Sequence, residues 1–227
     1  MGTLAPSIIS ADFRELRTQL ELVAPYAARW HVDVMDGHYV PNLTIGPMIV
    51  EAIRESSKLP QDVHLMITNP DDTWEWYAKA GASRIAFHPS TSQDPGKLLK
   101  AFADAGIGPG IAINPDVSVD ECKPLLEFVN HVIVMSVYPG FSGQRFIPDA
   151  LPKLTQLREM DDGLDLIIDG GVSPRNAAEC VEAGASVLVS ASAIFGSDNP
   201  SAVAEELATI GKGGGRGGGR DGPGRAS

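Results

Sequence analysis

Two short segments of the chain combine imidazole and carboxylate side chains at alternate positions. The first, residues 29–37, reads Arg-Trp-His-Val-Asp-Val-Met-Asp-Gly, and the second, residues 62–66, reads Asp-Val-His-Leu-Met. Side chains alternate across a β-strand, so His31 and Asp33 share one face of the first segment, and His64 lies on one face of the second. An apolar interior does not accept such groups without partners, so we expect these faces to build a site.

A further carboxylate ends an apolar segment later in the chain. Residues 164–169 read Leu-Asp-Leu-Ile-Ile-Asp, and two glycines follow Asp169. With His31, Asp33 and His64, this residue completes a set of two imidazoles and two carboxylates, which suits a divalent ion such as Zn²⁺, Fe²⁺ or Mn²⁺. Any single buried histidine is more often a satisfied core residue. Four such groups at strand ends favour a site instead.

Two carboxylates beside one metal ion suggest proton transfer at a carbon next to a ketone. A cation stabilises the enediolate that remains when such a proton is removed. One carboxylate can take the proton from one face of the carbon, and the other can return a proton to the opposite face. The carbon centre would then be inverted without an organic cofactor.

The elements that must position these groups alternate regularly along the chain. Apolar segments predict eight strands, at residues 4–9, 29–37, 62–67, 84–88, 110–113, 131–137, 164–169 and 186–190. Helices are predicted at residues 13–23, 47–55, 95–105, 119–128, 150–160, 176–183 and 200–210, with one more starting at 68–72. Eight such units of roughly 26 residues predict an α/β fold, the (β/α)₈ TIM barrel. A doubly wound open sheet is the alternative, but it has fewer units and fewer polar inward faces.

The composition describes a globular chain with an acidic body. The 227 residues are 43% hydrophobic, and the formal net charge is −11. Residues 211–227 carry a balance of +3, so residues 1–210 carry −14. An acidic body argues against a nucleic-acid substrate, and it requires backbone amides and a metal to hold a phosphorylated one. Cys122 and Cys180 lack metal-ligand spacing and are expected to be free thiols.

The two ends of the chain carry little structural information. No signal peptide and no apolar run of membrane-spanning length is visible, so we expect a cytoplasmic protein without a membrane partner. Nine of the seventeen residues 211–227 are glycine, which predicts a disordered Gly/Arg-rich tail after a barrel domain at residues 1–210. The tail loosely resembles RNA-binding segments, so an inert barrel with an RNA-binding tail is an alternative of another class. The four metal-binding groups argue against that alternative.

Glycine-rich loops follow two of the predicted strands. Tyr-Pro-Gly-Phe-Ser-Gly-Gln occupies residues 138–144, and Gly170 and Gly171 follow the seventh strand. Backbone amides in such loops can hold a phosphate, although turns need glycine in any case. The loop at residues 139–143 is long and flexible enough to close over a site as a lid. Strand alternation places Met35, Met66 and Met135 inside the barrel, where they could exclude water from a reaction.

Together these motifs resemble the ribulose-phosphate 3-epimerase family. The resemblance is carried by Ala-Pro-Ser-Ile-Ile-Ser-Ala-Asp-Phe at 5–13, His-Val-Asp-Val-Met-Asp-Gly at 31–37, Asp-Val-His-Leu-Met at 62–66, Met-Ser-Val-Tyr-Pro-Gly-Phe-Ser-Gly-Gln at 135–144, Asp-Gly-Gly-Val at 169–172 and Ser-Ala-Ser-Ala-Ile-Phe at 190–195. It covers about residues 4–210, and it implies a TIM barrel of the ribulose-phosphate-binding type.

The resemblance also implies an activity and a set of residues. The reaction would interconvert D-ribulose 5-phosphate and D-xylulose 5-phosphate at C3, in the pentose phosphate and Calvin routes. The enzyme would be a homo-oligomer, either a dimer or a hexamer, and would require no nucleic acid. Asp33 and Asp169 would be the acid–base pair and, with His31 and His64, would bind one divalent ion, Zn²⁺, Fe²⁺, Mn²⁺ or Co²⁺. Substrate would be contacted by Ser7, His64, Met35, Met66, Met135, Gly140, Phe141, Ser142, Gly143, Gly170, Gly171, Ala191 and Ser192.

The chain departs from the family pattern at two positions of the ordered region. Ala191 stands where the family motif usually has a glycine, and its methyl group would crowd a phosphate. Ser142 stands where the loop after the sixth strand usually has a second adjacent glycine. Neither departure removes a catalytic group, so we expect activity to be retained.

Two related reactions compete with this assignment. The same epimerisation could act on a six-carbon ketose phosphate such as D-allulose 6-phosphate, and the sequence does not separate the two substrates. Related barrels that decarboxylate orotidine monophosphate place a lysine between acids on a strand. Residues 31–36 contain no lysine, which argues against that reaction.

Overall fold

Eight parallel strands form the centre of the molecule. The structure is a computed structural model and describes residues 2–213. The strands are β1 (Thr3–Pro6), β2 (Trp30–Met35), β3 (Gln61–Met66), β4 (Arg84–Phe87), β5 (Gly108–Ile113), β6 (His131–Met135), β7 (Asp165–Asp169) and β8 (Val187–Ser190). Each strand pairs with the next in sequence from β2 to β8, and β8 pairs with β1. A parallel bridge between Ser7 and His31 joins β1 to β2 and brings the sheet round to a nearly closed barrel.

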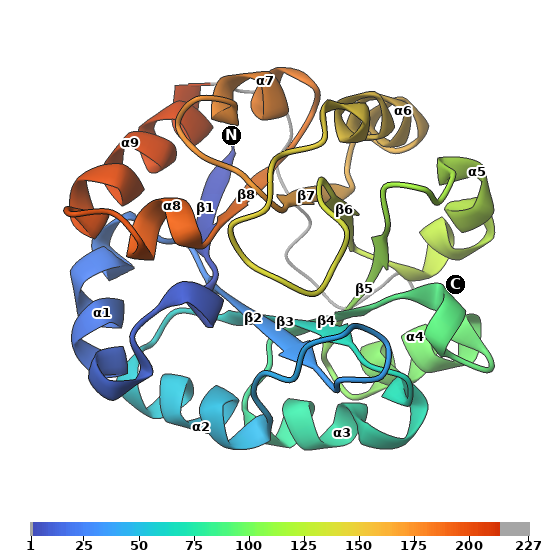
Figure 1. The fold of residues 1–227 in the computed structure, drawn as a ribbon. Coiled ribbons are helices and arrows are strands. Elements are labelled where there is room, and N and C mark those ends of the chain that lie inside the picture. Colours follow the sequence, from blue (N-terminus) through green and yellow to red (C-terminus); the bar gives the residue numbers. More distant parts are fainter. Residues whose placement is uncertain (1, 214–227) are drawn as a thin grey trace.

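Helices surround this barrel on the outside (Figure 1). They are α1 (Leu16–Val23), α2 (Pro47–Ser56), α3 (Pro70–Ala80), α4 (Pro95–Asp104), α5 (Val119–Cys122), α6 (Leu151–Met160), α7 (Ala177–Glu182), α8 (Ser192–Phe195) and α9 (Pro200–Gly213). The predicted TIM barrel is therefore confirmed, and the open doubly wound sheet is wrong. None of the helices within residues 2–213 is both long enough and apolar enough to cross a bilayer.

Several predicted elements are shorter than expected, and two of them have a clear local reason. The first strand ends at Pro6 because Ser7 caps a 3₁₀ turn, Ile8–Ser10, by accepting a hydrogen bond from the Ile9 amide. The helix predicted at 119–128 is α-helical only through Cys122 and continues as a 3₁₀ helix, Lys123–Phe128. Pro124 supplies no amide proton at the start of this second part, so an α-helical hydrogen bond is lost there.

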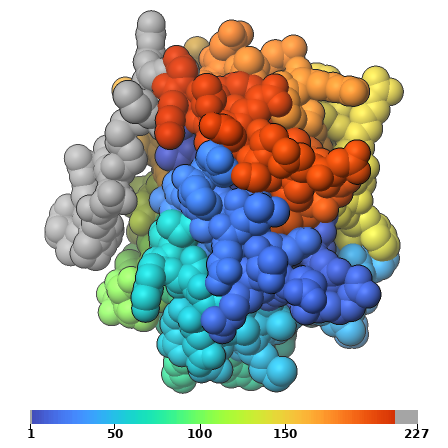
Figure 2. All heavy atoms as spheres, turned by 90° about the vertical axis from the view of Figure 1, so that its left-hand side faces the viewer, coloured from blue at the N-terminus to red at the C-terminus, as the bar shows by residue number. Residues whose placement is uncertain are grey.

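The last helix runs further than the predicted barrel domain. α9 continues to Gly213, so residues 211–213 are helical rather than part of a disordered tail. Gly211 is buried against the start of the chain, and a Cβ on it would lie 3.0 Å from the Gly2 carbonyl oxygen. Figure 2 shows this side of the molecule from outside, where C-terminal residues, in red, pack against N-terminal residues, in blue. The prediction for residues 214–227 lies outside the described residues.

In the described part of the chain, buried apolar residues form three clusters, of which the smallest contains Met35, Val40 and Met66. Most of the core lies between strands and helices, where the outward residues of the strands meet the helices. A second cluster fills the inside of the barrel and includes three alanines, Ala5, Ala86 and Ala112. Because these side chains are small, the interior has room for the imidazole rings that neighbouring strands project inward.

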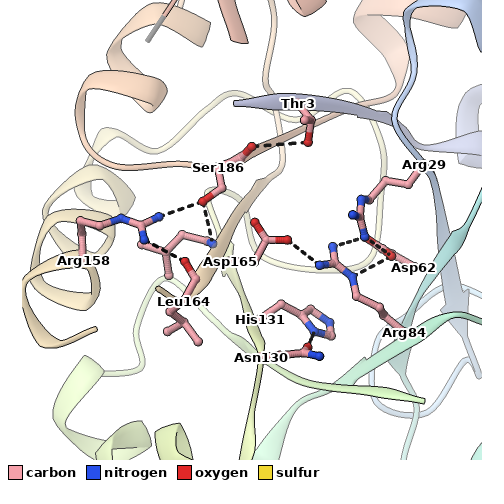
Figure 3. A network of polar contacts seen from close by, with 11 residues as sticks. Thr3, Arg29, Asp62, Arg84, Asn130, His131, Arg158, Leu164, Asp165 and Ser186 are labelled. Carbon is pink, nitrogen blue, oxygen red and sulfur yellow. Dashed lines mark hydrogen bonds and ion pairs between the residues drawn. The ribbon is translucent and has the colours of Figure 1, made fainter. Parts of the chain in front are cut away.

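A network of charged side chains lies at the N-terminal end of the barrel (Figure 3). Arg84 on β4 donates two hydrogen bonds to Asp62 on β3, at 2.9 and 2.5 Å, and one to Asp165 on β7, at 2.5 Å. Arg29 adds a bond of 3.0 Å to Asp62. Both carboxylates are buried, and the guanidinium of Arg84 therefore joins opposite parts of the barrel beneath the polar groups at the other end.

Candidate active site

Four side chains predicted to bind a metal converge inside the barrel. His31 and Asp33 come from β2, His64 from β3 and Asp169 from the last position of β7. Each offers one nitrogen or oxygen atom, and these four atoms all lie within 4.8 Å of one another. All four residues are buried.

The distances between these atoms fit a single metal ion. His31 Nε2 lies 3.3 Å from Asp33 Oδ1 and 3.5 Å from Asp169 Oδ2. His64 Nδ1 lies 3.4 and 3.5 Å from the same two oxygens. Zinc bonds of about 2.0–2.1 Å in a tetrahedral arrangement separate neighbouring ligand atoms by about 3.3–3.4 Å, close to these values.

The hydrogen-bond inventory supports the same reading. His31 Nε2 and His64 Nδ1 are buried and have no hydrogen-bond partner among the described residues. A buried polar atom without a partner is destabilising, so such atoms call for a missing ligand. Two imidazole nitrogens and two carboxylate oxygens are donors that Zn²⁺, Fe²⁺ and Mn²⁺ accept. The cluster therefore could hold a divalent ion.

The end of β2 is fixed by residues from two other segments. The Ser7 hydroxyl donates a hydrogen bond of 2.5 Å to Asp33 Oδ2, which leaves Oδ1 facing the cluster. The Thr44 hydroxyl donates to the Asp33 carbonyl at 2.8 Å and accepts from the Met35 amide at 2.9 Å. Asp33 is therefore held through both its backbone and its side chain.

The end of β7 is fixed by close packing of two loops. The Asp169 carbonyl accepts a hydrogen bond of 2.7 Å from the Ser136 amide. Gly170 and Gly171 then have φ angles of 115° and 65°, and a Cβ on Gly171 would lie 2.8 Å from the Phe146 amide nitrogen. Only glycine fits here, because both the backbone angle and the space exclude a side chain.

The charges of the cluster balance one another in the metal-free protein. Burial alone would lower the pKa of His31, but the carboxylates of Asp33 and Asp169 outweigh it and raise that pKa to about 10. The pKa of His64 is raised for the same reasons. Burial raises the pKa of Asp33, yet the two imidazoles reverse this and leave it lowered. The imidazoles and the carboxylates therefore each favour the charged form of the other.

A pocket is lined by almost all of the predicted substrate contacts. It includes Ser7, Asp33, Asp169, Met35, Met66, Met135, Gly140, Phe141, Ser142, Gly143, Gly170, Gly171, Ala191 and Ser192. His31 and His64 do not line it, so the structure places His64 behind the carboxylates rather than in the pocket wall. The three methionines do face the pocket, as strand alternation predicts.

Six further residues line the pocket that the sequence reasoning missed: Ile9, Val137, Pro139, Gln144, Val172 and Val189. Val137 and Val189 share strand parity with Met135 and Ala191, so alternation could have found them. The others lie in loops, where no such rule applies.

The loop at residues 139–143 crosses the middle of the barrel (Figure 1) and is tied to two other loops. Asn42 donates a hydrogen bond of 2.7 Å to the Gly140 carbonyl. The hydroxyl oxygens of Ser10 and Ser142 lie 2.6 Å apart. The Gln144 amide donates to the carbonyls of Tyr138 and Phe141 within the loop itself. The loop is thus held over the pocket.

Comparison with known proteins identifies the family. Residues 3–195 match the model of the Ribulose-phosphate 3 epimerase family. The chain belongs to this family. It is 41% identical to the "Ribulose-phosphate 3-epimerase, cytoplasmic isoform" of Oryza sativa subsp. japonica, over 90% of this chain and 92% of the relative. It is 44% identical to the "Ribulose-phosphate 3-epimerase" of Synechocystis sp., over 86% of this chain and 88% of the relative.

The fold is shared more widely than the family. A solved structure of 3-hexulose-6-phosphate synthase from Salmonella typhimurium superposes with a TM-score of 0.72 at 15% identity, covering 94% of this chain and 100% of that chain. This likeness concerns the barrel alone. The resemblance that the motifs predict is confirmed, and the chain is an enzyme of the ribulose-phosphate 3-epimerase family.

The two departures from the family motif both lie at the pocket. Ala191 has a φ of −116°, so its backbone does not adopt the left-handed conformation that favours glycine. Ser142 supplies the hydroxyl that meets Ser10, a contact that a glycine at this position could not make. The second departure therefore adds a tie to the loop over the pocket.

Proposed function

We propose that this protein interconverts D-ribulose 5-phosphate and D-xylulose 5-phosphate by moving a proton at C3. One observation carries the proposal: Asp33 and Asp169 both line the pocket, and both also offer an oxygen to the His31 and His64 cluster. Its family relatives are named for this reaction. A pair of carboxylates from different strands can serve opposite faces of one carbon.

The two carboxylates have separate tasks in this scheme. Asp33 takes the proton from C3 on one face, and Asp169 delivers a proton to the other face; the roles exchange in the reverse direction. Ser7 holds the second oxygen of Asp33, so that carboxylate keeps one orientation through the cycle. Met35, Met66 and Met135 line the pocket and exclude water that would otherwise compete for the proton.

A divalent ion held by His31, Asp33, His64 and Asp169 would stabilise the negative charge that develops on the substrate oxygens. The buried nitrogens without partners and the mixed nitrogen and oxygen donors support this assignment. We propose Zn²⁺, Fe²⁺, Mn²⁺ or Co²⁺ without a preference among them. The acidic body of the protein makes such a positive centre useful for binding a phosphorylated sugar.

The phosphate group of the substrate would lie at the glycine-rich side of the pocket. Gly143, Gly170, Gly171, Ala191 and Ser192 line that side together. Their backbone amides offer donors without adding bulk, and the Ser192 hydroxyl adds one more. Among residues 2–213, no basic side chain lines the pocket, so amides would hold the phosphate.

Proton exchange tests the proposal directly. Wild-type protein loaded with metal should incorporate deuterium at C3 of ribulose 5-phosphate in deuterated water and form xylulose 5-phosphate. Asp169→Asn should lose epimerisation by at least about 10³-fold, because one of the two faces lacks its carboxylate. Asp198→Asn, at an exposed surface position, is the matched control and should behave as wild type. Wild-type protein that exchanges no proton would overturn the proposal.

A six-carbon ketose phosphate remains the second candidate substrate, because the same carboxylates could act on it. D-allulose 6-phosphate should be compared with ribulose 5-phosphate by their kcat/KM ratio. We further propose a cytoplasmic homo-oligomer that acts in pentose phosphate metabolism. The name of the rice relative, a cytoplasmic isoform, supports the location.

A further inference from the structure

A third buried imidazole, that of His88, lies next to the cluster. His88 follows the end of β4, and its Nε2 lies 3.0 Å from His64 Nε2. The other nitrogen of His64, Nδ1, faces Asp33 and Asp169. The two nitrogens of His64 therefore have different surroundings: one faces the candidate metal site, and the other faces His88.

The proton inventory of this pair allows one arrangement when a metal is bound. A histidine binds a metal through a nitrogen that carries no proton, so Nδ1 of His64 must be bare and Nε2 must carry the proton. That N–H points at His88 Nε2, which accepts a hydrogen bond only if the His88 proton is on Nδ1. His64 then offers Nδ1 to the metal and donates from Nε2, and His88 accepts at Nε2.

We propose that His88 is a positioning residue that accepts a hydrogen bond from His64 and so fixes the tautomer in which His64 Nδ1 can bind a divalent ion. The inference rests on the metal site proposed above and adds a residue that lies outside the ligand set. Ligand histidines generally need such a partner, and its loss weakens metal binding.

The surroundings of His88 hold its ring in place. Its carbonyl accepts hydrogen bonds from the Thr91 amide at 2.9 Å and the Thr91 hydroxyl at 2.8 Å. The Tyr39 ring packs on the imidazole with 4.9 Å between centroids and an angle of 39° between planes. Asn114 donates to the Tyr39 hydroxyl at 3.0 Å, and the Tyr39 amide donates to Asp36. A ring held this firmly can impose an orientation on His64.

Another buried histidine of the barrel provides a comparison. His131 is as deeply buried as His88, but its Nδ1 meets the Asn130 side chain at 2.8 Å near the N-terminal end. Within residues 2–213, His131 forms no hydrogen bond or ring contact with His31 or His64. Burial in the barrel alone therefore does not produce the contact that His88 makes.

Metal affinity tests the inference without relying on turnover. Zn²⁺ binding should be measured by competition with a chromogenic chelator for wild type, His88→Leu, His88→Gln and the control His131→Asn. His88→Leu offers no acceptor and should bind Zn²⁺ about 10–100-fold more weakly, whereas the carbonyl of His88→Gln should keep the affinity within about threefold. His131→Asn should bind as wild type does. Equal affinity of His88→Leu and wild type would overturn the role of His88.

A measurement on the unmutated protein avoids any dependence on how the variants fold. In the Zn²⁺-loaded, ¹⁵N-labelled wild type, a coupling across the hydrogen bond should connect His64 Nε2 with His88 Nε2. A spectrum with the His64 proton on Nδ1 would overturn the inference. Wild-type protein that neither binds a divalent ion nor epimerises would instead remove the proposed function, and the role of His88 with it. If wild-type protein binds Zn²⁺ tightly and turns over fully, and His88→Leu binds Zn²⁺ equally well, only the role of His88 would be removed.

Discussion

Asp33 and His64 are register partners on neighbouring strands, and Asp33 Oδ1 lies 3.4 Å from His64 Nδ1. Parallel pairing of β2 with β3 therefore places an acid and an imidazole at the same height inside the barrel. His31, two residues earlier on β2, and Asp169 at the end of β7 complete the set from either side. Strand register, more than any loop, sets the geometry of this site.

Metal binding should release protons at neutral pH. The pKa of His31 is raised to about 10, so this ring is protonated at neutral pH in the metal-free protein, and the pKa of His64 is raised as well. A metal must displace the extra proton of the His31 ring before it can bind there. Calorimetric titrations with Zn²⁺ in buffers of different ionisation enthalpy should show this release. Heats that do not depend on the buffer would contradict it.

The same charges make the stability of the metal-free protein depend on alkaline pH. Because the folded pKa of His31 lies above its ordinary value of 6.5, its ion pairs stabilise the fold fully below pH 6.5. This contribution should disappear as the pH rises through about 10. Urea unfolding between pH 6 and 10 should follow this trend in metal-free protein and much less in Zn²⁺-loaded protein. A flat profile without metal would refute the expectation.

The contact between Ser10 and Ser142 should help to hold the loop over the pocket. Ser10→Ala, Ser142→Ala and the double variant form a cycle, whose coupling free energy we expect to be about 0.5–1.5 kcal/mol. Hydrogen exchange of the amides in residues 139–144 measures local opening of this loop. Faster exchange in each single variant, with no further increase in the double variant, is expected. Additive effects would show that the two hydroxyls do not interact.

Arg84 should be one of the most sensitive positions for stability. Arg84→Met leaves Asp62 and Asp165 buried without their main partner, and it should lower the free energy of unfolding by about 3–5 kcal/mol. Arg54→Met is the control, since Arg54 pairs with Glu51 at an exposed position and should matter by less than about 1 kcal/mol. Chemical unfolding measures both. Similar effects of the two changes would contradict this view of the network.

Gly110 should not tolerate even one added methyl group. A Cβ at this position would lie 2.1 Å from His131 Nε2, so Gly110→Ala must displace a buried ring. We expect a loss of about 1–3 kcal/mol or more in the free energy of unfolding. Gly46→Ala is a suitable control, because a Cβ there meets nothing within 4 Å. The melting temperatures of the two variants should differ clearly, and equal values would disprove the clash.

Strand alternation accounts for the part of the site that could be predicted from sequence. His31, Asp33, His64 and Met66 each fall on the inward face of a segment whose apolar neighbours point outward. Asp169 follows from the glycines that end its strand. The same rule places Arg84 and His88 on one face, so His88 could have been noticed as a fifth inward polar group.

Contacts between distant loops could not be predicted in this way. The bond between Ser10 and Ser142 joins residues 132 positions apart, and neither segment has a periodic pattern. The glycine-rich composition after residue 210 argues against a helix there. α9 nevertheless continues through Gly211, which lies close to Gly2 in the folded chain. In both places tertiary packing, rather than local preference, decides the outcome.

The network of charged side chains at the N-terminal end of the barrel bears on how a ligand reaches the site. Arg84, Asp62 and Asp165 bind one another on that side, whereas Asp33 and Asp169 line the pocket under the loop at 139–143, so we expect a sugar phosphate to enter and leave through that pocket. Product still in residence would block the next substrate. Each epimer should therefore be a competitive inhibitor of the turnover of the other, because both enter and leave the same pocket.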